Sequence, residues 1–387
     1  MTVIDRAKTT LERPLASYHL ILGVSALLMG LGLVMVLSAS SVFSFERYGS
    51  SYYIFTKQLI FAVLGLSAAF VASKLPIRII RMMAYPGLII ALGAICLTLV
   101  PGIGVNVKGN QNWISAGPIR IQPSELAKLA LILWSADLFA RKEKLLGNPR
   151  HVLIPMLPVA ALVAGLVVVQ HDLGTAIVIA AIVIGMLWAV GLPGRYMAVL
   201  ACAAGGIVIY LAATSDNRAR RMMNFLNPFA DADSSGYQVV HSNMALATGQ
   251  FWGSGLGAGQ QKWGRLPEAH TDFIFAVIGE ELGLFGTLIT LGLFGLLAYA
   301  CIRIASRARD PFARYAAAGI AVWFMVQVVI NVGMVLGLLP VIGIPLPFIS
   351  YGGSGLLTSL VAVGLLVNFA KFEPGAQRAL KSGKGRR

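Results

Sequence analysis

Long apolar runs separated by short polar segments make up most of the chain between about residues 18 and 370. Each run has roughly 17 or more mostly apolar residues, enough for a helix to cross the roughly 30 Å hydrocarbon core of a bilayer. Helices are expected because backbone polar groups must be paired internally in hydrocarbon, and no barrel-like alternation of polar and apolar residues is present. The pattern predicts ten spans, at residues 18–40, 53–73, 82–101, 124–140, 151–170, 173–192, 196–214, 273–302, 315–340 and 348–370.

Two of the connecting segments, residues 102–123 and 215–272, are much longer than the others. Loops longer than about 15 residues in a compact fold are usually functional or disordered. The second loop has 58 residues and is rich in aromatic residues, Gly and Met. We therefore expect it to fold back onto the membrane surface as short amphipathic pieces.

Composition agrees with a membrane protein. Of the 387 residues, 57% are hydrophobic and 12% are charged, and the mean hydropathy is +0.77, which excludes a single soluble core. The three cysteines all fall inside apolar runs without metal-ligand spacing, so we interpret them as small core residues. Residues 1–17 lack a cleavable signal pattern, so the first span is expected to be retained.

The net charge of +15 is explained by topology, because Lys and Arg concentrate in cytoplasmic loops. With the N-terminus inside, 21 of the 31 Lys and Arg residues fall in cytoplasmic segments, and no nucleic acid partner is needed. The prediction is an all-α, polytopic integral membrane protein with about ten transmembrane helices and a long extracytoplasmic loop between helices seven and eight. A cytoplasmic N-terminus (1–17) precedes the transmembrane domain (18–371), and a basic cytoplasmic tail (372–387) follows it.

Ionisable side chains inside a span are costly and are candidates for function by default. Span four contains Glu125, Lys128 and Asp137, and Asp172 begins span six. Spans four, six and eight run from outside to inside, so Glu125, Lys128 and Asp172 share the outer half of the membrane. Two interpretations are open: a buried ion cluster that locks helices together, and a polar cavity in which Lys128 holds a substrate phosphate.

A second group of candidates lies in the sequence LPEAHTDFIFAVIGEELG at 266–283. Its ionisable residues are Glu268, His270, Asp272, Glu280 and Glu281. Asp272 is either an acid or base or a helix N-cap. His270 is either an interfacial residue or a general base, and Glu280 and Glu281 either act in the chemistry or bond to neighbouring helices.

The segment GLLPVIGIPLPFISYGGSG at 337–355 combines three prolines with several glycines. Such a sequence interrupts a helix, and interrupted backbone at membrane depth is tolerated where it lines a cavity. This segment therefore indicates a path for a substrate.

These stretches resemble the SEDS family of cell-wall polymerases, and the division (FtsW-like) branch more closely than the elongation (RodA-like) branch. The similarity covers about residues 15 to 371. Its most specific motifs are QPSELAKL (122–129), DLGTA (172–176), GYQ (236–238), GSGLGAGQQK (253–262), LPEAHTDFIF (266–275), GEELG (279–283) and PLPFISYGGS (345–354). Two departures are Asn112, where members often have arginine before Trp113, and His171, where many have proline.

The resemblance implies a peptidoglycan glycosyltransferase that polymerises lipid II into glycan strands during septal cell-wall synthesis. The enzyme would lie in the bacterial cytoplasmic membrane, at the division septum, with a class B penicillin-binding (FtsI-like) transpeptidase and other divisome membrane proteins as partners. Asp272 matches the essential acid of the family. The substrate and cavity residues carried over are Glu125, Lys128, Asp172, Glu268, His270, Trp113, Gln122, Ser124 and Ser350.

The expected chemistry is an inverting transfer in which Asp272 deprotonates the acceptor hydroxyl while a lipid diphosphate leaves. A basic side chain or a loosely held divalent cation (Mg²⁺ or Mn²⁺) would stabilise the departing diphosphate. The alternatives are a transporter that flips lipid II, an elongation-type polymerase, and a non-catalytic scaffold. The absence of a clear inverted repeat and the acids at the outer surface favour the enzyme.

Overall fold

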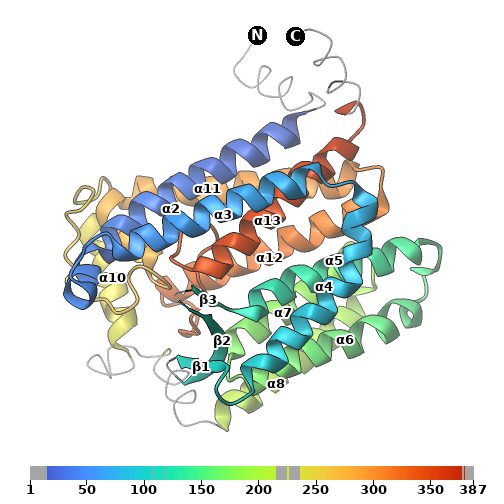
Figure 1. Cartoon of the computed structure of the whole chain (residues 1–387), viewed down its shortest axis with the longest axis horizontal. Coiled ribbons are helices and arrows are strands. Elements are labelled where there is room, and N and C mark those ends of the chain that lie inside the picture. The colour runs from blue at the N-terminus through green and yellow to red at the C-terminus, as the bar shows by residue number, and fades with distance from the viewer. Residues whose placement is uncertain are drawn as a thin grey trace.

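All ten predicted spans form helices in the computed structural model, which describes residues 15–107, 109–117, 119–214, 225, 236–376 and 379 (Figure 1). The predicted N-terminal segment and basic tail lie mostly outside the described residues. In chain order the ten helices are α2 (Ala16–Tyr48), α3 (Tyr53–Lys74), α4 (Ile77–Thr98), α5 (Pro123–Arg141), α6 (Pro149–Val169), α7 (Leu173–Ala189), α8 (Gly194–Ala213), α11 (Ile274–Arg307), α12 (Pro311–Val335) and α13 (Gly353–Phe369). Two short 3₁₀ turns follow α5 and α13, η1 (Glu143–Leu145) and η3 (Ala370–Phe372).

Within the described residues, eight helices are long and apolar enough to cross a membrane. The other two of the ten helices, α5 and α7, do not meet these criteria for physical reasons. Helix α7 has only 17 residues, and α5 carries Glu125, Lys128 and Asp137. Because α5 is buried along almost its whole length, its polar side chains meet protein and not lipid. The chain is therefore a polytopic, all-α membrane protein.

The helices run alternately up and down, which gives the bundle two distinct ends. We call the end that carries the strands and α10 (Tyr237–Gly249) the sheet end. The opposite end, where α3 finishes at Lys74 and α5 at Arg141, is the basic end. There Asp137 forms ion pairs with Arg81 at 2.8 Å and with Arg141 at 2.6 Å, so this buried carboxylate stabilises helix packing.

Helix α13 packs closely along α3, and α11 packs against α2 and α12 (Figure 1). The close approach of α13 depends on glycine. A Cβ built at Gly364 would lie 2.3 Å from the carbonyl oxygen of Ala69, and no side chain is tolerated at that separation.

Gly364→Ala is therefore expected to destabilise the bundle by about 1–3 kcal/mol, the usual cost of overpacking. Gly23→Ala is the matched control, because a Cβ at Gly23 in α2 would meet nothing within 4 Å and alanine favours a helix by about 1 kcal/mol. Thermal unfolding of both variants in detergent checks the prediction. Equal melting temperatures would show that the α3–α13 contact relaxes freely.

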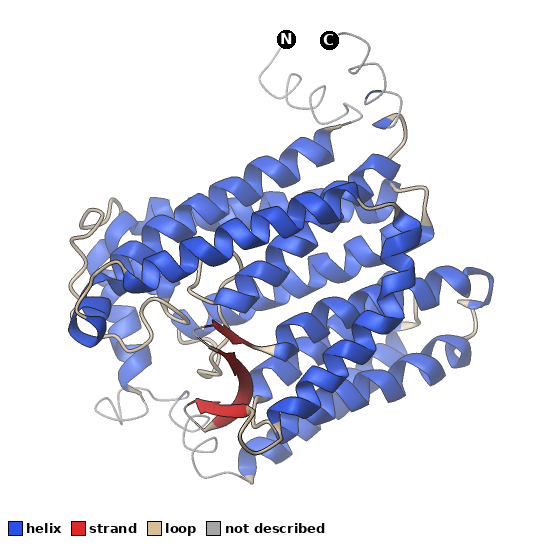
Figure 2. Cartoon of the chain, in the orientation of Figure 1, coloured by secondary structure: helices blue, strands red, loops and turns tan. Residues whose placement is uncertain are grey.

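The first long loop folds into a feature that the sequence analysis did not predict. It forms a small antiparallel sheet of β1 (Gly104–Val107), β2 (Asn110–Ala116) and β3 (Ile119–Ile121), in the order β1-β2-β3 (Figure 2). Positive φ angles at the connecting glycines, 90° at Gly109 and 64° at Gly117, suit tight turns. The signal was present as β-branched and aromatic residues around these glycines.

The second long loop contains one short helix, α10, followed by turns up to residue 273. This agrees with the expectation of short pieces in residues 236–272. Apart from residue 225, residues 215–235 lie outside the described part of the chain.

Candidate functional site

Helix α11 is interrupted inside the membrane domain. Gly283 has φ 68° and ψ −165°, so the helix consists of a short part, residues 274–282, and a long part, residues 284–307. Asp272 lies immediately before the short part, at the sheet end. The interruption predicted from prolines and glycines is also present, because α12 ends at Val335 and α13 begins only at Gly353.

The irregular segment between α12 and α13 packs directly on Asp272. Asn331 Nδ2 donates to the carbonyl oxygen of Asp272 at 2.8 Å and to that of Ile344 at 2.7 Å. Asp272 is half-buried, and a Cβ built at Gly343 would lie 3.3 Å from its Oδ2. The carboxylate therefore faces the glycine of this segment. The N-cap position of α11 is Phe273, without a side-chain cap bond.

Ser350, a predicted site residue, bonds the backbone just before Asp272. Its Oγ donates to the carbonyl oxygen of Thr271 at 2.6 Å and accepts from the Leu346 N–H at 2.8 Å. The Tyr351 N–H donates to the carbonyl oxygen of His270 at 2.9 Å. The backbone around Asp272 is thus fixed by α12, through Asn331, and by the irregular segment between α12 and α13.

His270 and Glu268 flank Asp272, as the motif predicted. The His270 ring lies between Phe43 of α2 and Tyr351, with centroid distances of 5.2 and 5.8 Å. Glu268 has a positive φ of 59° and accepts from Thr271 Oγ1 at 2.6 Å.

Lys128 and Glu125 form the buried pair that their spacing suggested. Lys128 Nζ lies 2.8 Å from Glu125 Oε1, and the two side chains are 1% and 6% exposed. The ammonium also lies 5.2 Å from the ring centroid of Trp323, a cation–π contact. A cavity of about 20 Å³ lies beside Glu125 and the 345–355 segment, which is room for about one water molecule.

Asp172 belongs to a different network, so the three charged residues do not form one ion cluster. It caps α7 by accepting from the Thr175 N–H at 3.0 Å. It also accepts from Asn112 Nδ2 at 2.7 Å and from Gln122 Nε2 at 3.1 Å. The reason is geometric: Asp172 is bonded by Asn112 of β2 and by Gln122, whereas the Lys128 ammonium lies over Trp323 of α12.

The two departures from the family pattern lie beside Asp172: Asn112 bonds it, and His171 precedes it in the chain. Asn112 supplies a neutral donor to Asp172, where an arginine would supply a charged one. His171 has φ 65°, a conformation that proline cannot adopt because its ring fixes φ near −65°. The turn into α7 therefore differs from one built on proline.

Two further predicted site residues, Trp113 and Ser124, lie on β2 and at the start of α5. Trp113 is half-buried on β2, opposite Val105. Ser124 is fully buried at the start of α5, and its Oγ has no hydrogen-bond partner in the described structure.

Among the described residues, no three His, Cys, Asp or Glu side chains are grouped so as to hold a metal ion. The described part of the chain therefore offers no dedicated metal site made of protein ligands.

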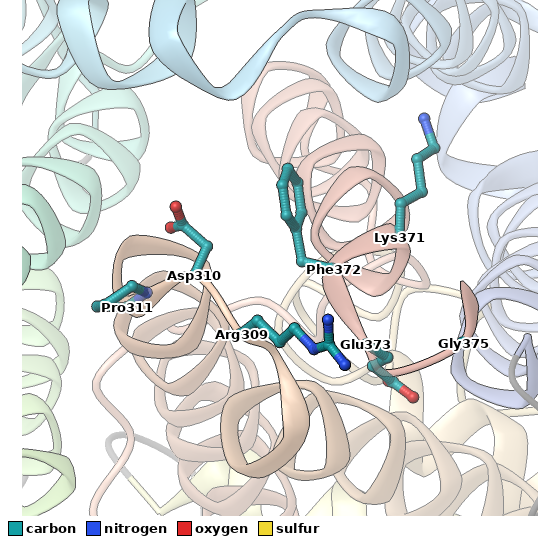
Figure 3. Close-up of a pocket in the computed structure, with 7 residues that line it drawn as sticks. All are labelled: Arg309, Asp310, Pro311, Lys371, Phe372, Glu373 and Gly375. Carbon is teal, nitrogen blue, oxygen red and sulfur yellow. The ribbon is translucent and has the colours of Figure 1, made fainter. Parts of the chain in front are cut away.

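A larger cavity, of about 480 Å³, lies at the basic end, far along the bundle from Asp272 (Figure 3). It is lined by the α11–α12 turn, with Arg309 and Asp310, and by Lys371 and Glu373 after α13. Its charges are balanced, and Asp310 caps α12. This cavity is therefore not part of the site around Asp272.

Residues that the sequence analysis missed are Asn331, which fixes the Asp272 backbone, and Lys262, which bonds Glu281. Asn331 is a fully buried amide in an apolar helix, so polarity inside a span was an available signal. Lys262 was placed in a motif but received no role.

Comparison with known proteins gives the chain its family. The FtsW/RodA/SpoVE model, described as cell cycle protein, matches residues 18–374. A probable peptidoglycan glycosyltransferase FtsW of Mycobacterium tuberculosis is 44% identical over 97% of this chain and 71% of that protein. A protein of the same name from Trichlorobacter lovleyi is 41% identical over 92% of this chain and 94% of its own length.

Solved structures show the same architecture. A chain of a peptidoglycan synthase complex superposes with a TM-score of 0.73 at 28% identity, covering 91% of this chain and 96% of that one. RodA of Thermus thermophilus gives a TM-score of 0.65 at 28% identity, covering 91% and 96%. Because the family model spans nearly the whole chain and the relatives exceed 40% identity, this chain belongs to the FtsW/RodA/SpoVE family of cell cycle proteins.

Proposed function

We propose that this protein is a peptidoglycan glycosyltransferase that polymerises lipid II into glycan strands, with Asp272 as the general base. The observation that carries the proposal is the placement of Asp272. Its carboxylate is half-buried at the head of an interrupted helix, its backbone is fixed by Asn331 and Ser350, and it faces the irregular segment at Gly343. The names of the similar proteins, peptidoglycan glycosyltransferases, support the same activity.

The reaction needs one base. The acceptor hydroxyl oxygen bonds to the anomeric carbon of the donor sugar, and the bond from that carbon to the diphosphate oxygen breaks. The hydroxyl proton passes to the Asp272 carboxylate, and the lipid diphosphate leaves with the bonding electron pair. Attack opposite the leaving group inverts an α-linked donor to a β-linked strand, and a positioned base contributes about 10²–10⁴ in rate.

The departing diphosphate requires positive charge nearby. Arg120 is an exposed basic residue on β3, at the sheet end, so we propose it as a candidate. A divalent cation carried by the diphosphate itself would serve the same purpose without protein ligands. Glu125, Lys128 and Asp172 shape the neighbouring interior of the domain.

We further propose a class B penicillin-binding transpeptidase as partner and the division septum as location, with other divisome membrane proteins nearby. The structural neighbour from a peptidoglycan synthase complex supports a partner of this kind. Relatives named FtsW at 41–44% identity, against 28% for RodA, support the division branch over the elongation branch.

The deciding experiment is glycan-strand formation from lipid II by the purified protein and its transpeptidase partner in detergent, with the transpeptidase site blocked. We expect strands with the wild-type protein and a large loss with Asp272→Asn. Transfer of lipid II across proteoliposomes without any strand formation would instead support the transporter alternative.

The proposed geometry also requires the sheet end to be extracytoplasmic. In a variant with Cys96, Cys202 and Cys301 replaced by alanine, Ser50→Cys at the sheet end should react with an impermeant thiol reagent added outside the cell. Lys144→Cys at the basic end should react only after permeabilisation. Both positions are exposed, and the reverse pattern would remove Asp272 from the side where the strand grows.

A further inference from the structure

The break at Gly283 leaves the short part of α11 without the support that a continuous helix would give it. Residues 274–282 make up about two turns, and Gly283 departs from helical φ and ψ. Helices of this length are marginal without tertiary contacts. The direction of this short part, and of Asp272 before it, must therefore be fixed from outside α11.

A glycine-rich segment, residues 249–262, supplies that support through the backbone. The Ser254 and Gly255 N–H groups donate to the carbonyl oxygens of Glu280 and Glu281 at 2.9 and 3.0 Å. The approach is so close that a Cβ at Gly253, the first residue of the GSGLGAGQQK motif, would lie 2.2 Å from the Glu281 carbonyl oxygen. The glycines of the GSGLGAGQQK motif thus allow this segment to lie directly against the break.

Both buried carboxylates of the GEELG motif bind the same segment. Glu280 Oε1 accepts from the Gln260 and Gln261 N–H groups at 2.7 and 3.2 Å. Glu281 Oε2 accepts from the Gly257 N–H at 3.1 Å. Glu280 and Glu281 are 0% and 1% exposed, so neither is presented to a substrate.

Lys262 bonds Glu281, the glycine-rich segment and α2 at the same time. Its Nζ lies 2.8 Å from Glu281 Oε1, 2.7 Å from the Gly257 carbonyl oxygen and 3.0 Å from Ser38 Oγ. An ammonium has three protons to donate, and all three are used. Ser38 belongs to α2 and itself donates to Glu281 at 2.7 Å, so this cluster joins α2, the glycine-rich segment and α11.

We propose that the Lys262–Glu281 ion pair, with Ser38, is a latch that orients residues 274–282 and so positions Asp272 for catalysis. The inference rests on the proposed glycosyltransferase function. Helix α2 contacts Glu281 near the end of the short part through Ser38, and it contacts His270, two residues before Asp272, through Phe43. Lys262 and Glu281 act through Asp272 and are positioning residues.

The chain offers a matched control on the same helix. Arg303 and Glu373 form another buried pair, 6% and 3% exposed and 3.5 Å apart, on the far side of Gly283. The test compares Lys262→Met/Glu281→Gln with Arg303→Met/Glu373→Gln, each purified with the transpeptidase partner. Both double variants remove a buried pair without stranding one charge.

We expect both variants to melt below the wild type, but only the Lys262/Glu281 variant to lose turnover. Measured on folded protein, its kcat should fall by about tenfold to 10²-fold, as misplacement of a catalytic group by about 1 Å does, with KM for lipid II within about twofold. Equal kcat losses in the two variants, or wild-type kcat in the Lys262/Glu281 variant, would overturn the latch.

Ser38→Ala keeps the test decisive if the double variant does not fold. It removes the contacts of Ser38 with Lys262 and Glu281 and keeps the ion pair, so a several-fold fall in kcat at unchanged KM is expected. Wild-type kcat would contradict the proposal. A wild-type protein that forms no strands would overturn the proposed function itself. An active wild type with unaffected latch variants would overturn only the latch.

Discussion

Asp272→Asn should lower lipid II polymerisation by about 10² or more while leaving the fold intact, because Asn cannot accept a proton as a carboxylate does. The Asp272 backbone is bonded by Asn331, and the backbone of its neighbour Thr271 is bonded by Ser350. The substitution keeps those contacts. Strand formation with the blocked transpeptidase partner measures the activity, and thermal unfolding measures the fold.

Asp272→Ala tests the two interpretations of Asp272 that the sequence left open, a general base and a helix N-cap. The assigned N-cap position of α11 is Phe273, which makes no side-chain cap bond. Asp272→Ala should lose activity as Asn does, and its loss of stability should not exceed the roughly 1 kcal/mol that removal of a cap brings. Near-normal polymerisation by the Asn variant would move the base to Glu268 or His270, since Glu280 is fully buried.

Lys128→Met should destabilise the protein by about 3–5 kcal/mol, because removing one partner of a buried pair strands the other charge. The stranded group is Glu125, 6% exposed beside a cavity of about 20 Å³, too small to hydrate a carboxylate. Melting temperature and the yield of folded protein report the loss. Lys144→Met, at an exposed lysine, is the control and should behave like the wild type.

The double variant Lys128→Met/Glu125→Gln separates the effect of an unpaired buried charge from the effect of altered side-chain packing. It removes both charges, so most of the stability lost in Lys128→Met should return. A Lys128→Met protein with normal stability and full polymerase activity would show that the pair neither holds the helices together nor shapes a cavity.

The sequence determined the membrane architecture because bilayer thickness imposes it. Any helix that crosses roughly 30 Å of hydrocarbon needs about 20 mostly apolar residues. The ten spans could therefore be predicted from the sequence without knowing which helices pack against each other. The irregular backbone between α12 and α13 was equally readable, because prolines and glycines disfavour helix wherever they cluster. The position of Asp272 at the head of a span followed from the same local pattern.

Only the tertiary structure decided which polar groups meet. Glu125, Lys128 and Asp172 shared one half of the membrane in the sequence analysis, yet Asp172 turned to Asn112 and Gln122 under a sheet that was not predicted. The Ser38–Glu281 contact joins residues 243 positions apart. The local sequence pattern indicates how deep in the membrane a residue lies and on which face of its helix. Contacts between distant residues depend instead on how the helices are arranged around each other, which is set by packing across the whole bundle.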